Sequence, residues 1–364
     1  MIWLTWRQFR ASAATAAALL AALAAVLALT GPGMADDYAA GVVACKRRPG
    51  GCGNFYQDFY HAHMAAFFGV TVVVLLLPAL LGLFWGAPLI TRELETGTHR
   101  LVWNQSVTRT RWLTVKLGLV GLGATAAAGI GSLAVTWWAG PLDASAARNT
   151  PSFPRMGPLL FDARGLVPVA YAAFAFLLGV AVGTVVRRTL PAMAVTLAVF
   201  AVVQLAMPLL VRPHFAAPVR ASQTIGTANL DDFFVGHNGE PVQMTVQSQA
   251  PGDPNAWVLE NRLVDAAGRP TNGTIKVSTT SGPCAPEQSA PPGGAPGQAG
   301  RPPAGESPIS ACLAEINRLG YRQRLVYQPS SRYWAFQWAE TGIFAVLAAG
   351  LAGFCFWTVR RRLS

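Results

Sequence analysis

The chain has 364 residues, of which 52% are hydrophobic and 12% are charged, and its formal net charge is +11 at pH 7. So apolar a composition agrees with a membrane protein. The positive charge does not indicate nucleic-acid binding, because the basic residues are dispersed at the ends of apolar stretches, where they suit anchoring against anionic lipid. We therefore expect contact with membrane lipid and no nucleic-acid partner.

Six long stretches of the sequence, each of at least 19 residues, contain no Asp, Glu, Lys or Arg. They cover residues 11–35, 59–91, 117–142, 165–186, 189–211 and 341–359. About 20 apolar residues cross the hydrocarbon core as a helix, and a helix satisfies its own backbone hydrogen bonds in lipid. The sequence predicts an all-α integral membrane protein with six transmembrane helices, five of them within 11–211 and the sixth at 335–359.

The orientation follows from the basic residues in the short connections, since Lys and Arg are retained on the cytoplasmic side. With the N-terminus inside, the cytoplasmic segments contain Arg7, Arg10, Arg92, Arg100, Arg109, Arg111, Lys116, Arg187, Arg188, Arg360, Arg361 and Arg362. The two short outside connections contain only Lys46, Arg47, Arg48, Arg148, Arg155 and Arg164. We expect a multi-pass plasma-membrane protein with both termini, including the tail 360–364, in the cytoplasm.

The residues before the first span predict an interfacial helix at 1–10. Ile2, Trp6 and Phe9 share one helical face, and tryptophans next to arginines suit the headgroup zone. The alternative is that these residues are the frayed beginning of the first span.

The cytoplasmic connection between spans four and five is residues 187–189, and so short a link predicts a tight antiparallel hairpin. Two glycine pairs have the four-residue spacing that allows close helix packing in lipid. These pairs are Gly82 with Gly86 and Gly179 with Gly183. We assign them a packing role and no other.

Residues 212–334 form the one long water-exposed segment, and we expect a small extracellular α/β domain there, between spans five and six. Alternating apolar and polar residues at 242–246 and 275–277 predict short strands, and the apolar spacing at 309–319 predicts an amphipathic helix. The stretch 285–308 is dominated by Pro, Gly, Ala and Ser, and we expect it to be disordered.

Four of the cysteines lie in segments assigned to the outside of the membrane, where disulfides persist. We expect Cys45 to pair with Cys52 and Cys284 to pair with Cys312. Four cysteines allow three pairings, and four free thiols are the alternative.

The longest cytoplasmic connection, 91–112, contains the acidic residues assigned to that side, Glu93 and Glu95. Gly97 weakens a helix, whereas Ser106 and Thr108 are good N-caps for a helix that continues into the membrane. We predict a short helix, a break and a long helix. The alternative is a solvated loop that carries its charges for solubility.

This connection resembles the loop between spans two and three of type-2 ABC exporter permeases, the ABC-2 type transmembrane subunits, in their actinobacterial form. The resemblance is carried by Glu93, Glu95, Gly97, Thr98, Arg109 and Lys116, with Val107 in place of the family's turn proline. The six spans, the hairpin, the enlarged external loop and the run 327–340 at the start of span six match the same layout. The resemblance implies that the loop docks on a separate ATP-binding subunit. It also implies that the loop transmits the conformational closure of that subunit to the spans.

Three polar residues in the spans are candidates for a transport pathway: Gln204 in span five, and Gln337 and Glu340 in span six. Polar and charged groups within the bilayer are costly, and they mark pathways or paired contacts. The alternative for Glu340 is a place at the outer interface with hydrogen bonds to Arg332 or Tyr333. The alternative for Gln204 is a hydrogen bond to a neighbouring helix.

The sequence contains no Gly-x-x-x-x-Gly-Lys-Ser/Thr motif for ATP and no His-Glu-x-x-His motif for an intramembrane metalloprotease. His61 and His63 are two residues apart and do not share a helical face, so we expect no metal site. We therefore expect that the chain is not an enzyme and holds no cofactor. ATP and Mg²⁺ would bind to the partner subunit.

The leading hypothesis is a permease subunit of an ATP-driven exporter of a hydrophobic or amphiphilic small molecule, whose identity the sequence does not give. Its partners would be a cytoplasmic ATP-binding subunit and a second copy of the permease or a related permease. One alternative is a membrane sensor or scaffold with an extracellular ligand-binding domain. The other is an ion-coupled secondary carrier, although such carriers place ionisable groups near the midplane, between repeated halves.

Overall fold

The structure is a computed structural model that describes residues 2–49, 51–97, 108–148, 153–236, 240–285 and 308–361. It has two compact units. The first, called the helical unit here, comprises Met1–Ala216 and Ser331–Ser364, and the second, the sheet unit, comprises Ala217–Ser330.

Six helices of the described residues are long and apolar enough to cross a membrane, which agrees with the predicted number of spans. They are Phe9–Lys46, Gly53–Glu95, Arg109–Trp138, Val167–Val186, Thr189–His214 and Ser330–Arg361. The chain is thus a multi-pass membrane protein.

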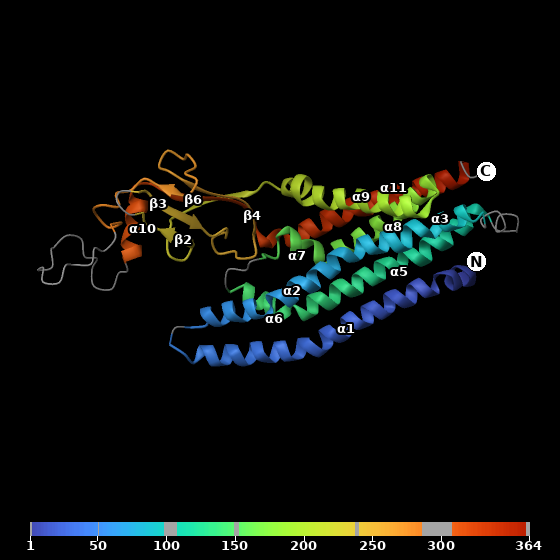
Figure 1. Ribbon diagram of the computed structural model, residues 1–364, viewed down its shortest axis with the longest axis horizontal. Coiled ribbons are helices and arrows are strands. Elements are labelled where there is room, and N and C mark those ends of the chain that lie inside the picture. The colour runs from blue at the N-terminus through green and yellow to red at the C-terminus, as the bar shows by residue number, and fades with distance from the viewer. Residues whose placement is uncertain are drawn as a thin grey trace, which may run out of the picture. The chain divides into compact units, whose positions relative to one another are not determined.

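The helical unit consists of long helices with short ones at their ends (Figure 1). In chain order these are α1 (Ile2–Lys46), α2 (Gly53–Leu81), the π-helix η1 (Gly82–Gly86), α3 (Ala87–Glu95), α5 (Arg109–Trp138), α6 (Gly140–Ala146), α7 (Pro158–Ala163), α8 (Val167–Val186), α9 (Thr189–Ala206), the π-helix η2 (Met207–Val211), the 3₁₀ helix η3 (Arg212–His214), the 3₁₀ helix η4 (Ser330–Arg332) and α11 (Tyr333–Arg361).

The first helix differs from the expectation of a separate interfacial helix at 1–10. Helix α1 runs without a break from Ile2 to Lys46. Residues 11–18 are mostly alanine, the residue with the highest helix propensity, so nothing in the sequence ends a helix after Arg10. Residues 2–10 are therefore continuous with the first span, and their placement along the membrane surface stays a prediction.

Helix α8 is the centre of the helical unit. In the most apolar window of each span, 67% of the α8 residues are buried, against 6% for α1. A helix that is apolar on all sides is suited to such a central place. Helices α2, α3, α5, α9 and α11 all pack against α8, whereas α1 packs mainly on α5.

The four predicted packing glycines bring α8 close to η1 and α3. A Cβ atom on Gly179 would lie 2.6 Å from Ala87 N, and one on Gly183 would lie 2.9 Å from Ala87 O. Cβ atoms on Gly82 and Gly86 would likewise meet the backbone of α8. The glycines are required at this contact because any side chain would force the two helices apart.

The sheet unit contains two three-stranded antiparallel sheets, with strand orders β1-β6-β4 and β2-β3-β5. Its elements are β1 (Val219–Gln223), β2 (Leu230–Phe234), β3 (Val242–Val246), β4 (Trp257–Val264), β5 (Thr274–Ile275), α10 (Pro308–Arg318) and β6 (Arg322–Gln328). The predicted strand at 242–246 and the amphipathic helix at 309–319 are present. The stretch expected to be disordered lies almost entirely outside the described residues.

The boundary of the sheet unit corrects the expectation that the external domain starts at residue 212. Arg212 belongs to the helical unit and is fully buried there. The helical chain continues past Val211 because η2 and η3 extend it to His214. The sheet unit begins only at Ala217.

Candidate functional site

Helix α3, the break after it and helix α5 follow the predicted order of a short helix, a break and a long helix. Helix α3 ends at Glu95, and Gly97 follows with a φ of +70°, which favours glycine. Thr108 is the N-cap of α5, and its Oγ1 accepts a hydrogen bond from Arg111 N at 3.3 Å. Arg109 is the first residue of α5 and is half-buried. Thr98, Ser106 and Val107 lie outside the described residues.

Glu93 and Lys116 form a buried ion pair between α3 and α5. Their side chains are 13% and 4% exposed. The ammonium of Lys116 also lies 4.8 Å from the ring centroid of Trp112. Glu93 therefore has its counter-charge within the chain, and the pair joins the two helices on either side of the segment.

Glu95 accepts two hydrogen bonds from the first residue of α9. Its Oε1 accepts a hydrogen bond from Thr189 N at 2.7 Å, and its Oε2 accepts one from the Thr189 hydroxyl at 2.7 Å. A carboxylate at the start of a helix satisfies a backbone N–H and complements the helix dipole. The end of α3 is thus attached to the α8–α9 hairpin, whose turn contains Arg187 in the left-handed conformation with a φ of 57°.

A pocket of about 270 Å³ opens beside the Glu93–Lys116 pair. Helices α1, η1, α3 and α5 line it, with Phe9, Trp85 and Leu89 as apolar walls and Arg92, Glu93 and Lys116 as charged groups. The pocket therefore offers both kinds of surface that an amphiphilic molecule requires.

A second group of charges is buried around Arg212, and we call Asp162, Tyr171, Arg212 and Glu340 the arginine cluster. The Arg212 Nε and Nη2 atoms donate to Glu340 Oε2 and Oε1, both at 2.8 Å. Nη2 also donates to Asp162 Oδ1, and the Tyr171 hydroxyl donates to Glu340 Oε1. The guanidinium carbon lies 4.2 Å from the ring centroid of Phe161. The cluster connects α7, α8, η3 and α11, which lie together in the helical unit (Figure 1).

The arginine cluster settles the position of Glu340. Glu340 is fully buried, and its partner is Arg212 rather than Arg332 or Tyr333. Sequence reasoning missed Arg212 because it directly follows a charge-free stretch and was assigned to the next domain, and it missed Asp162 altogether. Burial raises the pKa of Asp162, which lies in α7 outside the six spans, to about 7, although Arg212 acts in the opposite direction.

Gln337 is fully buried, and its amide binds backbone groups of two neighbouring elements, while its place on a transport pathway stays a prediction. Its Oε1 accepts hydrogen bonds from Leu166 N at 2.9 Å and Val167 N at 3.1 Å. Its Nε2 donates to Phe161 O at 3.0 Å and Arg164 O at 3.1 Å. One amide thus satisfies backbone groups at the end of α7 and the start of α8, which helices leave without partners of their own.

Gln204 makes a contact with a neighbouring helix, as its alternative interpretation stated. Its Nε2 lies 3.4 Å from Asp162 Oδ2, which joins α9 to the arginine cluster. Its Oε1 is buried and has no hydrogen-bond partner among the described residues.

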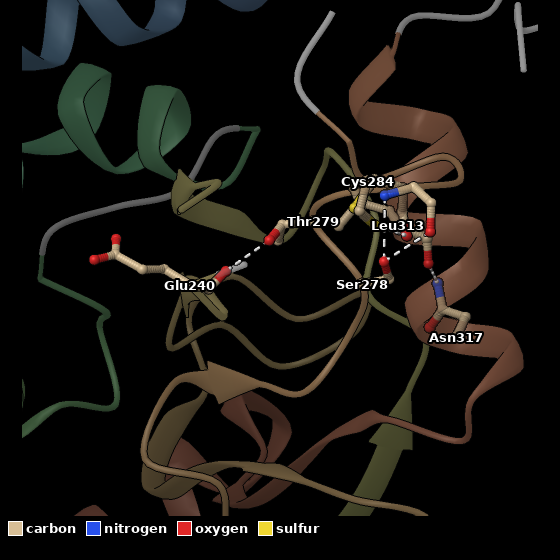
Figure 2. Close-up of a disulfide and its surroundings, with 8 residues drawn as sticks. Glu240, Ser278, Thr279, Cys284, Leu313 and Asn317 are labelled. Carbon is tan, nitrogen blue, oxygen red and sulfur yellow. Dashed lines mark hydrogen bonds between the residues drawn. A yellow bond between two sulfur atoms is a disulfide. The ribbon is translucent and has the colours of Figure 1, made fainter. Parts of the chain in front are cut away.

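The structure contains two disulfides, Cys45–Cys52 and Cys284–Cys312, with the pairings favoured by the sequence. The first joins the end of α1 to the start of α2. The second attaches α10 to the segment after β5, and Figure 2 shows Cys284 beside this helix. Asn317 of α10 also donates to Leu313 O at 2.9 Å.

A comparison with protein families identifies the class of this six-span protein. The model of the family "ABC-2 membrane transporter related" matches residues 17–212. The match extends from α1 through Arg212 and includes the segment between α3 and α5. The chain belongs to this family. No curated protein and no solved structure matches the chain.

Proposed function

We propose that the chain is the membrane-spanning permease subunit of an ATP-driven exporter of a hydrophobic or amphiphilic small molecule. A separate cytoplasmic subunit binds ATP and Mg²⁺, and a second copy of the chain or a related permease completes the pathway. Membership of the ABC-2 membrane transporter related family supports a permease that works with an ATP-binding subunit.

The observation that carries the proposal is the attachment of the segment 91–112 to three other parts of the helical unit. Glu93 binds α5 through Lys116, and Glu95 binds the start of α9 through Thr189. The residues before them pack on α8 through the close glycine contacts. A displacement of this segment by a partner subunit would therefore reach α5, α8 and α9 together. Contiguous packing and hydrogen-bond contacts of this kind can carry coupling between a docking surface and the spans.

The orientation of the proposed permease rests on basic residues at one end of the helical unit. The beginning of α1, the end of α3 and the end of α11 lie at the same end (Figure 1). Basic residues there include Arg7, Arg10, Arg92, Arg109, Arg111, Arg360 and Arg361. The positive-inside rule assigns this end to the cytoplasm of a plasma-membrane protein. The sheet unit, inserted between η3 and α11, would then be extracellular.

The pocket beside Glu93 supports an amphiphilic substrate. It lies at the proposed cytoplasmic end, where a molecule arriving from the inner leaflet would meet apolar walls and charged groups together. An amphiphile buries its apolar part against the walls and leaves its polar part near Arg92 and Lys116.

Crosslinking tests the proposal. A photoreactive amino acid replaces exposed Thr96, next to α3, in the chain expressed in its own host. We expect a crosslink to a protein with a P-loop ATPase motif, and stimulation of that protein's ATPase activity in the purified complex. The matched control is the same amino acid at Asn54, which is exposed in the first turn of α2 at the opposite end of the span.

The control position should give no such crosslink. Equal capture from both positions, or capture of a signalling kinase at Thr96, would contradict the permease proposal and favour a sensor.

A further inference from the structure

The arginine cluster has an excess of negative charge. Asp162 and Glu340 each contribute one negative charge when ionised, and Arg212 contributes one positive charge. The fourth member, Tyr171, is a neutral phenol at ordinary pH. A buried net charge is costly because protein and lipid solvate it poorly. With both carboxyls ionised the cluster would hold one uncompensated negative charge.

The neighbouring arginines, Arg155 and Arg164, interact with other residues. Arg164 is paired with Asp143 of α6, which forms a balanced pair of its own. Arg155 is exposed, and its guanidinium lies 4.3 Å from the ring centroid of Tyr333. Neither arginine forms an ion pair with Asp162 or Glu340 among the described contacts.

The hydrogen bonds distinguish the two carboxyls. Glu340 accepts at both oxygens, with Arg212 donating to each and Tyr171 donating to Oε1. A carboxylate that faces donors on both sides is ionised. Asp162 accepts from Arg212 at Oδ1, whereas its Oδ2 lies 3.4 Å from Gln204 Nε2, which is long for an N–H···O bond.

Gln204 has a buried acceptor that lacks a partner. Its Oε1 has no hydrogen-bond partner among the described residues, and an orphaned buried acceptor is unfavourable. The amide Nε2 faces Asp162 Oδ2 at 3.4 Å, so this donor stabilises a charge on Oδ2 only weakly. The Tyr171 hydroxyl also lies 3.4 Å from Asp162 Oδ1, and Asp162 is therefore the carboxyl of the cluster with the weaker donors.

We propose that the arginine cluster binds one proton, which resides on Asp162 Oδ2. This single proton brings the formal charge of the cluster from −1 to zero. The proton comes from water and returns to it, so no other reactant is involved. The raised pKa of Asp162, with burial as its main cause, agrees with this assignment.

Proton occupancy would also affect the contact between α7 and α9. Loss of the proton leaves an ionised Oδ2 facing Gln204 Nε2, so release of the proton favours a closer contact between Gln204 and Asp162. The site thereby links proton occupancy to the position of α9 in a protein whose proposed energy source is ATP. The inference concerns this chain alone and does not depend on the ATP-binding subunit.

Infrared spectroscopy of the purified full chain in lipid nanodiscs tests the proposal. We expect the carbonyl band of a protonated carboxyl at pH 6 that is lost at pH 9. Incorporation of ¹³C-labelled aspartate should shift this band without any substitution, and Asp162→Asn should abolish it. The control is Asp143→Asn, which removes the half-buried carboxylate paired with buried Arg164 and should leave the band unchanged.

Three results would overturn the proposal: no protonated-carboxyl band at pH 6, a band shifted by labelled glutamate instead of aspartate, or a band that persists in Asp162→Asn. If Asp162→Asn does not fold, the isotope shift in the unsubstituted chain still decides the outcome.

Discussion

The ion pair between Glu93 and Lys116 makes a strong prediction about stability. Glu93→Gln keeps the shape of the side chain but leaves the buried Lys116 ammonium without its counter-charge. Removal of one partner of a buried ion pair costs about 3–5 kcal/mol. Solvent screening does not reduce this figure much, since both side chains are nearly inaccessible. At about 2 °C of midpoint shift for each kcal/mol in a chain of this size, thermal unfolding should move down by about 6–10 °C.

Thermal unfolding of the purified chain in detergent, followed by tryptophan fluorescence, measures this shift. The double variant Glu93→Leu with Lys116→Met removes both charges and should regain most of the lost stability. Glu260→Gln is the control, because its pair with Arg262 is exposed, at 40% and 56%, and such pairs contribute about 0–1 kcal/mol. A Glu93→Gln midpoint within about 2 °C of the unsubstituted chain would refute the reasoning, by the same conversion.

This prediction changes the design of any coupling experiment. On the sequence alone, alanine at Glu93 and Glu95 together should abolish transport while the chain melts normally. The structure predicts that alanine at Glu93 destabilises the chain, so loss of transport in that double variant would not identify a docking residue. Glu95, which is exposed and contacts Thr189, is the better position for separating coupling from folding.

Further variants test the remaining contacts. Gln337→Leu removes four hydrogen bonds at the α7–α8 junction and should cost at least about 4 kcal/mol, seen as a lower unfolding midpoint; a neutral result would return Gln337 to the pathway candidates. Glu95→Ala should leave the midpoint near normal and reduce stimulation of the partner ATPase, whereas full stimulation would remove this contact from coupling. Peptide mapping without reductant should recover Cys284 linked to Cys312, and replacing both by serine should destabilise the sheet unit by about 3–4 kcal/mol; recovery of free thiols would contradict the bridge. The pKa of Asp162 in the folded chain, about 7, lies above its value in the unfolded chain, so the stabilising effect of its proton is lost as pH rises through 7. The thermal unfolding midpoint of the unsubstituted chain should therefore fall more steeply between pH 5 and pH 8 than the midpoint of Asp162→Asn.

The spans were predictable because one dominant physical effect sets them. Charges are costly in hydrocarbon, so charge-free stretches locate the membrane helices in one dimension without knowledge of contacts. The strand at 242–246 was predictable for a similar reason, since alternation is a local pattern. Compartment and position in the chain favoured the observed disulfide partners, although three pairings and free thiols were open on the sequence alone.

Long-range pairing was not predictable from local patterns. Arg212 lies just after a charge-free stretch, and a count of charges places such an arginine outside the membrane. Its partners are Glu340, 128 residues away, and Asp162, 50 residues away, and no spacing rule connects positions so distant. The ion pair of Glu93 with Lys116 was unpredictable for the same reason, because no local pattern in the sequence connects a carboxylate in a predicted loop with a particular lysine.

The contacts of Glu95 and Arg212 give α9 a particular place in the proposed mechanism. The span Thr189–His214 has 26 residues and is roughly 39 Å long as a helix. Only 17% of its most apolar window is buried, so packing along its middle holds it weakly compared with α8. Its first residue is bound by Glu95, next to the proposed docking segment, and Arg212 near its other end is bound by Asp162 and Glu340. Polar contacts therefore attach this span at both of its ends. A displacement of α3 would pull directly on the start of α9, and the protonation of Asp162 would change its contact with Gln204 at the far end.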